Sequence, residues 1–570
     1  MPDLHIVIAG AAGQGVQSAA AILGKLLLRQ GLHVFTVQDY QSRVRGGHNF
    51  MSIRVADYPV AAAVDPIDYL IALNEESLHL HLPELAPRGT ALCMEADRGR
   101  VSDPRLRALP DDIGPAGANN PKYVGVKLVT MLTEMVGFAK QLLIDAVRQE
   151  MGARLKPEIF QLNLEAIDAT AHFVGDADRH TLPFRVDPAH RQMFVEGNEA
   201  LALGLIAGGI GCYYGYPMSP STSILNTLAE FGPEVGIAVE QAEDEICALN
   251  AAIGAAYAGA RAAAGTSGPG VSLMTEAVGL AGATETPVVI IDAQRPGPAT
   301  GMATRTEQGD LLHAAHCGHG EFPRAIVAPA DHYDCFYLGA EAFNIAERWQ
   351  LPVFLLTDQA LADAQRTVEV FDDARVTIDR GPIAPEPPQP AVLRRYEDTP
   401  SGVSPRAYPA LSKWIVSADG HEHNEVGHLT DDRANRVRQM DKRRRKLAGL
   451  AAEFAGPEIV GDADGVLFLV WGSTTGPALE AAARLRARGE RVGVAVFRHL
   501  YPMNKDKTRA ALAPAARLYT LENNGEGQLG QLLLLETGLA THGHLGNSDG
   551  RVFTVAEAER RMAETLGGAS

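Results

Sequence analysis

The stretch GCYYGYPMSPST, residues 211–222, decides the fold class of this 570-residue chain. It begins as a short β-rich run, turns at two prolines among Ser and Thr hydroxyls, and ends where a helical pattern starts. The same order recurs after it, with strand-like runs at 236–239, 261–266, 287–292 and 352–357 separated by Ala/Gly-rich helical patterns. This alternation predicts a parallel α/β sheet.

Two further segments show the same alternation. The first has strand-like runs at 5–9, 33–37 and 69–73 and a helical pattern from residue 16 to about 30; the last has them at 465–472, 491–497 and 517–522, with a helix at 477–488. We therefore expect three parallel-sheet α/β domains, at residues 1–185, 190–375 and 465–570. Between the last two, residues 376–464 form a Pro-rich arm and a basic segment. We expect its run Arg433–Lys446 to be a solvated helix.

Composition excludes several classes of protein. Lys and Arg number 51 against 69 Asp and Glu, a net charge of −18, which argues against nucleic acid as a partner. The chain has no apolar run long enough to span a membrane and no signal-peptide pattern at its start, so we expect a soluble cytoplasmic protein without a membrane partner. Its five cysteines form no C-x-x-C pair, so we expect no iron–sulfur cluster or structural zinc on this chain.

The run Gly10–Gly15 lies between the first strand and the first helix, where free N–H groups and the helix dipole favour a phosphate. We take Gly13 and Gly15, with Arg43 and Arg45 downstream, as a candidate phosphate or coenzyme A site. The spacing G-x-x-G-x-G is not the dinucleotide fingerprint, but Asp39 ends the second strand and keeps a nicotinamide cofactor open. Tight strand–helix packing without a ligand is the other alternative.

Polar or glycine-bearing loops follow four strands of the second domain. They are Tyr216–Thr222, Glu240–Glu245, Thr266–Gly270 and, after the strand that ends at Asp292, Thr304–Asp310. Each alone is explained by helix capping or by the helix dipole. Because the carboxyl ends of parallel strands meet at one edge of a sheet, the four together predict a site.

Two histidine clusters raise zinc as an alternative. They comprise His313, His316, Cys317 and His319, and, more loosely, His421, His423 and His428. The first group is close enough in the chain to ligate zinc, but its place after the Thr304–Asp310 loop favours a position in the lining of the substrate pocket. We expect no metal on this chain.

These loops resemble the α subunit of 2-oxoacid:ferredoxin oxidoreductases. The resemblance lies in Tyr216–Thr222, the helix Glu240–Gly259, Thr266–Gly270 and Thr304–Leu311. Gly10–Val16 and Arg43–Gly47 resemble that family's γ domain, and Leu521–Asn524 with Gly527–Gln531 its transketolase-C-like domain. The resemblance spans nearly the whole chain. It implies a Rossmann-like γ domain, a pyrimidine-binding domain for thiamine diphosphate and a transketolase C-terminal-like domain.

The resemblance also implies the reaction. Such enzymes decarboxylate a 2-oxoacid with thiamine diphosphate, transfer the acyl group to coenzyme A and pass electrons to ferredoxin, and some run the reverse carboxylation. It implies a separate β subunit that holds the diphosphate, Mg²⁺ and a [4Fe-4S] cluster, in an (αβ)₂ assembly. The fusion of γ and α is typical of the 2-oxoglutarate branch, with pyruvate or a broad range of 2-oxoacids as the alternative.

Residue roles follow from matching motifs. Glu245 matches the family's catalytic glutamate, which hydrogen-bonds the aminopyrimidine ring, and Glu243 is the fallback. Ser219, where many relatives have Thr, and Arg305 match substrate-binding positions. Contacts to the cofactor are implied for Tyr216, Pro217, Pro220, Ser221, Thr266, Ser267 and Gly268.

His316 or His319, following the Arg305 loop, is expected to reach the distal carboxylate of a dicarboxylic substrate.

Two other classes of protein stay open. A nicotinamide-dependent dehydrogenase would rest on Gly10–Gly15 and Asp39 alone. A non-catalytic assembly subunit would explain the arm and the missing metal ligands, but not the four polar loops.

Overall fold

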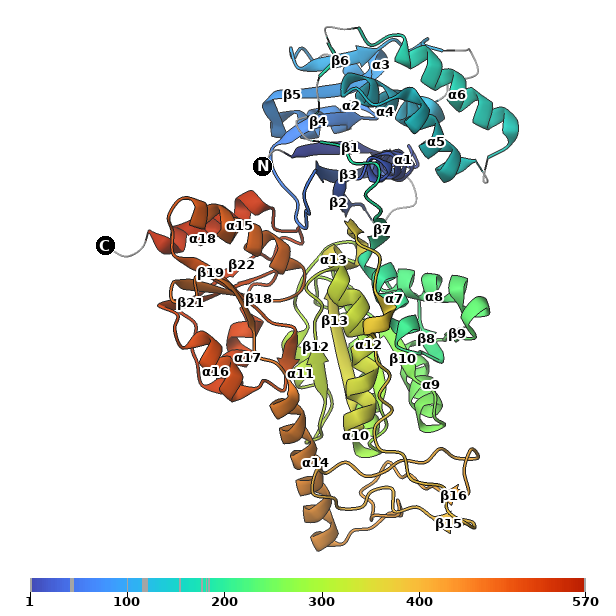
Figure 1. Ribbon diagram of the computed structural model, residues 1–570, viewed down its shortest axis with the longest axis vertical. Coiled ribbons are helices and arrows are strands. Elements are labelled where there is room, and N and C mark those ends of the chain that lie inside the picture. The colour runs from blue at the N-terminus through green and yellow to red at the C-terminus, as the bar shows by residue number, and fades with distance from the viewer. Residues whose placement is uncertain are drawn as a thin grey trace. The chain divides into compact units, whose positions relative to one another are not determined.

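A computed structural model describes residues 3–41, 46–99, 101–114, 121–152, 155–175, 178–180, 182 and 185–567 (Figure 1). The chain divides into two compact units. The first contains residues 1–195, 364–370 and 554–556, and the second contains the rest. Sheets flanked by helices build both units, so the predicted α/β class is confirmed.

The first unit is built on one eight-stranded sheet of order β6-β5-β4-β1-β3-β2-β14-β7. Its strands are β1 (Leu4–Ala12), β2 (His33–Asp39), β3 (Gly46–Ala56), β4 (Ile67–Ala72), β5 (Leu85–Met94), β6 (Leu106–Leu109), β7 (Met193–Glu196) and β14 (Gln365–Val368). Its helices are α1 (Val16–Arg29), α2 (Glu75–His81), α3 (Glu95–Arg98), α4 (Val124–Met135), α5 (Lys140–Met151) and α6 (Pro157–Ala171).

This first sheet is mixed rather than wholly parallel. β1, β4, β5 and β6 run parallel, as expected, but β3 lies antiparallel between β1 and β2. An antiparallel neighbour needs no crossover helix, so β3 can follow β2 after a short connection. The strand-by-strand pattern used for prediction assumed a helix between strands and therefore missed β3.

The second unit contains a seven-stranded sheet of order β20-β12-β13-β11-β10-β8-β9, parallel except for β20. Its strands are β8 (Cys212–Gly215), β9 (Ala238–Gln241), β10 (Ala262–Thr266), β11 (Val288–Gln294), β12 (Ala325–Val327), β13 (Pro352–Asp358) and β20 (His499–Tyr501). The helices between them are α7 (Gly197–Ala207), α8 (Thr222–Val235), α9 (Glu245–Tyr257), α10 (Gly268–Ala283), α11 (Leu311–Ala315), α12 (His332–Trp349) and α13 (Gln359–Asp363). Because β10, β11 and β13 bury every residue, helices must cover both faces.

A five-stranded sheet of order β17-β19-β18-β21-β22 completes this unit. Its elements are β17 (Glu458–Gly461), β18 (Val466–Val470), α15 (Thr475–Ala487), β19 (Val492–Val496), α16 (Lys505–Leu512), β21 (Arg517–Glu522), α17 (Gln528–Thr537), β22 (Gly543–Gly546) and α18 (Val555–Leu566). One apolar cluster joins the two sheets. It contains Leu467 of β18 and Trp471, which follows β18, together with Ala248 of α9 and Met274 of α10. The two sheets are therefore held by a continuous core.

The Pro-rich arm contains only the short strands β15 (Ala391–Val392) and β16 (Trp414–Ile415) before the long helix α14 (Arg433–Glu453) (Figure 1). It is not a free arm, because Arg395, Tyr396 and Ser404 are buried within this unit. No helix among the described residues combines the length and the apolar composition that crossing a membrane requires.

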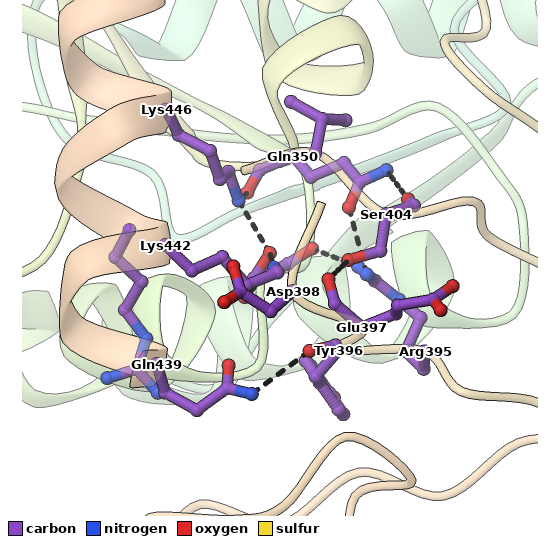
Figure 2. A network of polar contacts seen from close by, with 12 residues as sticks. Gln350, Arg395, Tyr396, Glu397, Asp398, Ser404, Gln439, Lys442 and Lys446 are labelled. Carbon is purple, nitrogen blue, oxygen red and sulfur yellow. Dashed lines mark hydrogen bonds and ion pairs between the residues drawn. The ribbon is translucent and has the colours of Figure 1, made fainter. Parts of the chain in front are cut away.

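The prediction that Arg433–Lys446 is a solvated helix is wrong for one face of α14. Lys442 and Lys446 are completely buried, and Figure 2 shows them pointing from α14 toward the segment of Arg395. Lys442 Nζ donates to both carboxylate oxygens of Glu285, at 2.6 and 2.7 Å. Lys446 Nζ donates to Glu285 at 2.8 Å and to the carbonyl of Gln350 at 2.8 Å. Residues four apart lie on the same helix face, so one buried carboxylate binds both ammonium groups.

Candidate active site

The order of strands in the seven-stranded sheet places a topological switch point, at which successive crossovers leave in opposite directions, beside β8. The chain leaves β8 toward β9 on one side and then returns to β10 on the other side of β8. Crossovers on either side of such a switch point leave a crevice at the carboxyl ends of the two central strands, which is where ligands bind in open parallel sheets. The turns after β8 and β10 are the predicted loops Tyr216–Thr222 and Thr266–Gly270.

The turn after β8 is held by its own polar groups. Ser221 is buried, and its Oγ donates to the carbonyl of Met218 at 2.8 Å. Asn198 Nδ2 donates to the carbonyl of Pro220 at 2.9 Å. Tyr216 and Pro217 are exposed, and Ser219 is half-buried. Ser221 and Pro220 thus shape the turn, while Tyr216, Pro217 and Ser219 are accessible to a ligand.

Glu245 is the first residue of α9 and is only 3% exposed. The preceding Asp244 caps the helix by accepting a hydrogen bond from the backbone N–H of Cys247 at 2.7 Å, so Glu245 is not needed as a cap. Its Oε1 is buried and has no hydrogen-bond partner among the described residues. A buried carboxylate oxygen without a partner is costly, so a ligand group that hydrogen-bonds it would be stabilised there. Glu243, the fallback, lies before the helix and is exposed.

The turn after β10 packs directly against Glu245. A Cβ at Gly270 would lie 2.7 Å from Glu245 Cγ and 3.0 Å from its Oε1, and would clash with Thr266 Oγ1. Thr266 is fully buried and donates to the sulfur of Met218 at 3.8 Å. Ser267 is also fully buried, and its Oγ has no hydrogen-bond partner within the described ranges. The structure therefore brings the loops after β8, β9 and β10 together around one carboxylate.

Arg295, just after β11, was not among the predicted site residues. It is 7% exposed, and its Nη1 donates to the carbonyl of Ser219 at 2.8 Å. Burial lowers the pKa of its guanidinium, and the nearby Glu245 opposes that shift. Arg295 thus links the Ser219 turn electrostatically to Glu245. The position of Arg295 at the end of a strand is the feature of the sequence that could have identified it as a site residue.

Two further acids, Asp292 and Asp310, lie close to these loops. Asp292 is fully buried within β11, and neither of its carboxylate oxygens has a partner among the described residues. Burial, and then the charge of Asp310, raises the pKa of Asp292 well above its ordinary value. Burial, and then Glu307, raises the pKa of Asp310 to about 6. A Cβ at Gly268 would clash with Asp310 Oδ2, so this carboxyl lies against the start of α10.

Arg305 lies half-buried in the loop Thr304–Asp310. The next residue, Thr306, donates its backbone N–H to the carbonyl of Gly550 at 3.2 Å. A Cβ at Gly550 would lie 3.0 Å from Arg305 Cβ. The loop that carries the predicted substrate arginine is thus in contact with the C-terminal sheet domain.

Both predicted histidines are exposed. His316 is exposed, and its Nδ1 forms a 3.0 Å hydrogen bond with the carbonyl of Leu312. It lines a pocket of about 360 Å³ with Arg324, Tyr501 and residues of α14, none of which belongs to the loops around Glu245. His319 is exposed. Among the described residues no cluster of three or more His, Cys, Asp or Glu is arranged to hold a metal ion.

The glycine turn of the first unit is open. Gly13 and Gly15 have φ of 90° and 87°, and a Cβ at either would meet no atom within 4 Å. Glycine is therefore required here by backbone conformation, not by close packing. Gln14 Oε1 stabilises the conformation of the turn by accepting a hydrogen bond from the backbone N–H of Ala11 at 2.7 Å. The predicted partners Arg43 and Arg45 lie outside the described residues.

Comparisons with known proteins match both units. Residues 203–443 match the family model described as pyruvate flavodoxin/ferredoxin oxidoreductase, thiamine diP-bdg. Residues 5–173 match the model described as pyruvate ferredoxin/flavodoxin oxidoreductase.

Related chains are matched over nearly their full length. The α subunit of 2-oxoacid:ferredoxin oxidoreductase 2 from Aeropyrum pernix is 33% identical over 99% of this chain and 98% of its own. The 2-oxoglutarate oxidoreductase subunit KorA from Mycobacterium tuberculosis is 30% identical over 93% of this chain and 86% of its own. Among solved structures, a 2-oxoglutarate:ferredoxin oxidoreductase from Magnetococcus marinus with 2-oxoglutarate, coenzyme A and succinyl-CoA bound superposes with a TM-score of 0.91 at 29% identity, covering 99% of this chain and 100% of the other.

Proposed function

Because the chain belongs to the family of 2-oxoacid:ferredoxin oxidoreductase α subunits, we propose that it forms the aminopyrimidine side of a thiamine diphosphate site. With a β subunit, it would convert 2-oxoglutarate, coenzyme A and oxidised ferredoxin to succinyl-CoA, CO₂ and reduced ferredoxin, and catalyse the reverse carboxylation. The names of the M. tuberculosis and M. marinus relatives favour 2-oxoglutarate over pyruvate as the substrate.

One observation carries the proposal: the unpartnered, buried Oε1 of Glu245 at the meeting point of three strand-end loops. Thiamine diphosphate, when bound, supplies the electron sink that decarboxylation of a 2-oxoacid needs. Glu245 would share a proton between Oε1 and a ring nitrogen of the cofactor. Gly270 leaves the space that Glu245 occupies, and Ser267 Oγ, also buried without a partner, is a second group that can bind the cofactor. The residues present therefore fit the aminopyrimidine ring.

Substrate recognition falls to the neighbouring cationic and hydroxyl groups. Arg305 would hold the carboxylate next to the oxo group of the substrate with its forked donors. The Ser219 hydroxyl, on the accessible part of its turn, would bind the same carboxylate or the oxo oxygen. Arg295 holds that turn through the carbonyl of Ser219.

The role of His316 and His319 at the distal carboxylate is a separate proposal. Replacing either with Ala should raise KM for 2-oxoglutarate more than KM for pyruvate. Equal effects on both substrates would leave these histidines outside the substrate site, as the different surroundings of His316 suggest.

A partner subunit is needed to complete this half-site. Apolar side chains are exposed on the three elements around Glu245: Tyr216 is 41%, Ile246 48% and Leu273 53% exposed. Contiguous exposed apolar surface marks an interface. We propose that the β subunit covers it and brings the diphosphate site, Mg²⁺ and the [4Fe-4S] cluster in an (αβ)₂ assembly that reduces ferredoxin. The cytoplasmic location predicted from composition stays a prediction.

In the first unit, the glycine turn is the proposed site for the phosphates of coenzyme A. Gly13 and Gly15 leave the turn open in front of α1, and Arg43 and Arg45 would supply cations. Titration of the isolated chain with coenzyme A, compared with a Gly13→Val variant, measures this contribution directly.

The test of the whole proposal is to co-express the chain with its β subunit and measure the reduction of a viologen dye by 2-oxoglutarate. Reduction should require both coenzyme A and thiamine diphosphate, and should be faster with 2-oxoglutarate than with pyruvate. If the assembled complex turns over no 2-oxoacid, the proposal is wrong. If it prefers pyruvate, only the substrate assignment is wrong.

A further inference from the structure

The loop that carries Arg305, residues Thr304–Asp310, is called the Arg305 loop below. Side chains of other elements hold it at Thr306, Gln308, Gly309 and Asp310. Thr306 Oγ1 donates to Asp358 Oδ1 at 3.2 Å. The backbone N–H of Asp310 donates to Gln294 Oε1 at 3.0 Å. Further bonds to the loop come from the C-terminal sheet domain.

Gln308 is the centre of these contacts and is completely buried. Its Nε2 donates to the carbonyl of Trp471 at 2.7 Å, and its Oε1 accepts from the backbone N–H of Asn523 at 2.8 Å. Its own backbone N–H donates to the carbonyl of Asn523 at 2.7 Å, and its carbonyl accepts from Asn524 Nδ2 at 3.0 Å. Both the side chain and the backbone of Gln308 are therefore fixed by the turn after β21.

Gln528, in the first turn of α17, holds the loop at its other end. Its Nε2 donates to the carbonyl of Gly309 at 2.6 Å, and its Oε1 accepts from the backbone N–H of Leu312 at 3.0 Å. One side-chain amide thus pairs with backbone groups on both sides of Asp310. Such paired contacts set the position of a loop, whereas apolar packing alone tolerates sliding.

The turn that supplies these groups is itself rigid. Glu522, fully buried, accepts from Trp471 Nε1 at 3.1 Å, from Asn524 Nδ2 at 3.0 Å and from the backbone N–H of Leu529 at 3.0 Å. Asn524 Oδ1 accepts from the backbone N–H of Gly527 at 2.8 Å. Hydrogen bonds to a buried carboxylate are among the stronger ones in proteins. The loop is therefore tied to a preorganised anchor.

We propose that Asn524 and Gln528 are positioning residues for substrate binding: they hold the Arg305 loop so that the guanidinium of Arg305 meets the substrate carboxylate. This inference rests on the proposed function of Arg305. It assigns to the C-terminal sheet domain a role in substrate affinity, although that domain contributes no side chain to the contacts found around Glu245. Displacing a binding group by even about 1 Å is enough to weaken its contribution strongly.

The test compares two glutamines of the same helix. Gln528→Ala removes both bonds to the Arg305 loop. Gln531→Ala is the matched control, because the Gln531 side chain is exposed and its Nε2 donates to the carbonyl of Glu526 within the same segment, at 2.9 Å. In the complex with the β subunit, Gln528→Ala should raise KM for the 2-oxoacid about tenfold, the effect of losing a well-placed hydrogen-bond pair. KM for coenzyme A and the affinity for thiamine diphosphate should not change, and Gln531→Ala should change none of these.

A double-variant cycle separates positioning from a general structural effect. In an Arg305→Ala background, Gln528→Ala should raise KM no further, because the group it positions is gone. If the two effects multiply, or if Gln528→Ala and Gln531→Ala behave alike, the inference is wrong. If Gln528→Ala does not assemble, Gln528→Glu keeps the acceptor for Leu312 and removes the donor to Gly309, and carries the same test. If the wild-type complex turns over no 2-oxoacid, the proposed function itself is wrong. If Arg305→Ala raises KM for the 2-oxoacid but Gln528→Ala does not, only the positioning role of Gln528 is wrong.

Discussion

Two buried glutamates of the second unit, Glu245 and Glu285, show opposite ways of keeping a carboxylate out of water. Glu285 is fully buried and accepts from Lys442 and Lys446, so its charge is balanced by two cations. Burial alone would raise the pKa of Glu285, but Lys442, Lys446 and Arg395 outweigh it and hold that pKa well below its ordinary value. Glu245 is 3% exposed, and its Oε1 has no hydrogen-bond partner in the part of the chain that the structure describes.

The difference separates a carboxylate that is paired within the fold from the one that we propose to bind the cofactor. Removing one partner of a buried ion pair destabilises a fold, because the other charge is left buried without a counter-charge. A buried oxygen without a hydrogen-bond partner lowers the stability of the fold, and such an oxygen is expected where a ligand binds it. Similar burial thus accompanies opposite roles. What distinguishes them is where their hydrogen bonds go.

The largest expected effect is on catalysis at Glu245. Glu245→Gln should lower kcat by about 10³-fold, because an amide cannot exchange a proton with the cofactor. It should leave the free energy of unfolding nearly unchanged, since Oε1 has no partner to lose. Viologen reduction and urea unfolding of the same preparation measure both quantities. A variant that keeps normal turnover would move the catalytic role to another residue.

Glu285→Gln is the mirror experiment. It should destabilise the fold by about 3–5 kcal/mol, because Lys442 and Lys446 are left buried without a counter-charge. Turnover per folded molecule should stay the same. A triple replacement of Glu285, Lys442 and Lys446 by apolar residues of similar volume should recover much of the stability, measured by urea unfolding. If Glu285→Gln instead abolishes turnover in folded protein, the comparison fails.

The acids next to the site give a pH dependence of stability. The pKa of Asp310 is raised from 3.8 to about 6, so the folded state binds a proton more tightly than the unfolded state does. The contribution of Asp310 to the free energy of unfolding is fully present below pH 3.8 and is lost as the pH rises through about 6.

Asp310→Asn should remove this dependence. It should stabilise the protein by about 2–3 kcal/mol at pH 7.5 relative to wild type, at one pKa unit per 1.36 kcal/mol, and by much less at pH 4. Unfolding by urea at the two pH values measures the difference. An equal effect at both would mean that Asp310 does not carry the proton.

The smallest expected effects compare two glycines of α10. Gly270→Ala should destabilise the protein by about 1–3 kcal/mol and weaken cofactor binding, because its Cβ overlaps Glu245 and Thr266. Gly279→Ala should stabilise it by about 0.5–1 kcal/mol, because the nearest atom to its Cβ, in Phe322, is 3.9 Å away. Thermal unfolding and titration with thiamine diphosphate measure both. Equal effects would show that the space beside Glu245 is not special.

Much of this architecture could be predicted from local pattern. The helix starting at Val16 and the strands at 352–357 and 491–497 lie within a residue or two of α1, β13 and β19. Glu245 is predicted as a site residue because a strand end, an acidic cluster and a helix of small residues stand next to one another in the chain. Arg295 was passed over because nothing local distinguishes it from any arginine after a strand. Its hydrogen bond to Ser219 spans 76 residues.

Local sequence patterns were sufficient to predict the α/β class, the strand-end loops and the family, because alternation, turn residues and motifs are all local in the chain. Which charges are paired became visible only in the folded chain. The basic run on α14 looked solvated until Glu285, 157 residues earlier than Lys442, proved to lie against it. The folded chain also brings Gln528 to a loop 219 residues away. Burial and hydrogen-bond partners depend on chain segments that meet only after folding, and no local pattern encodes them.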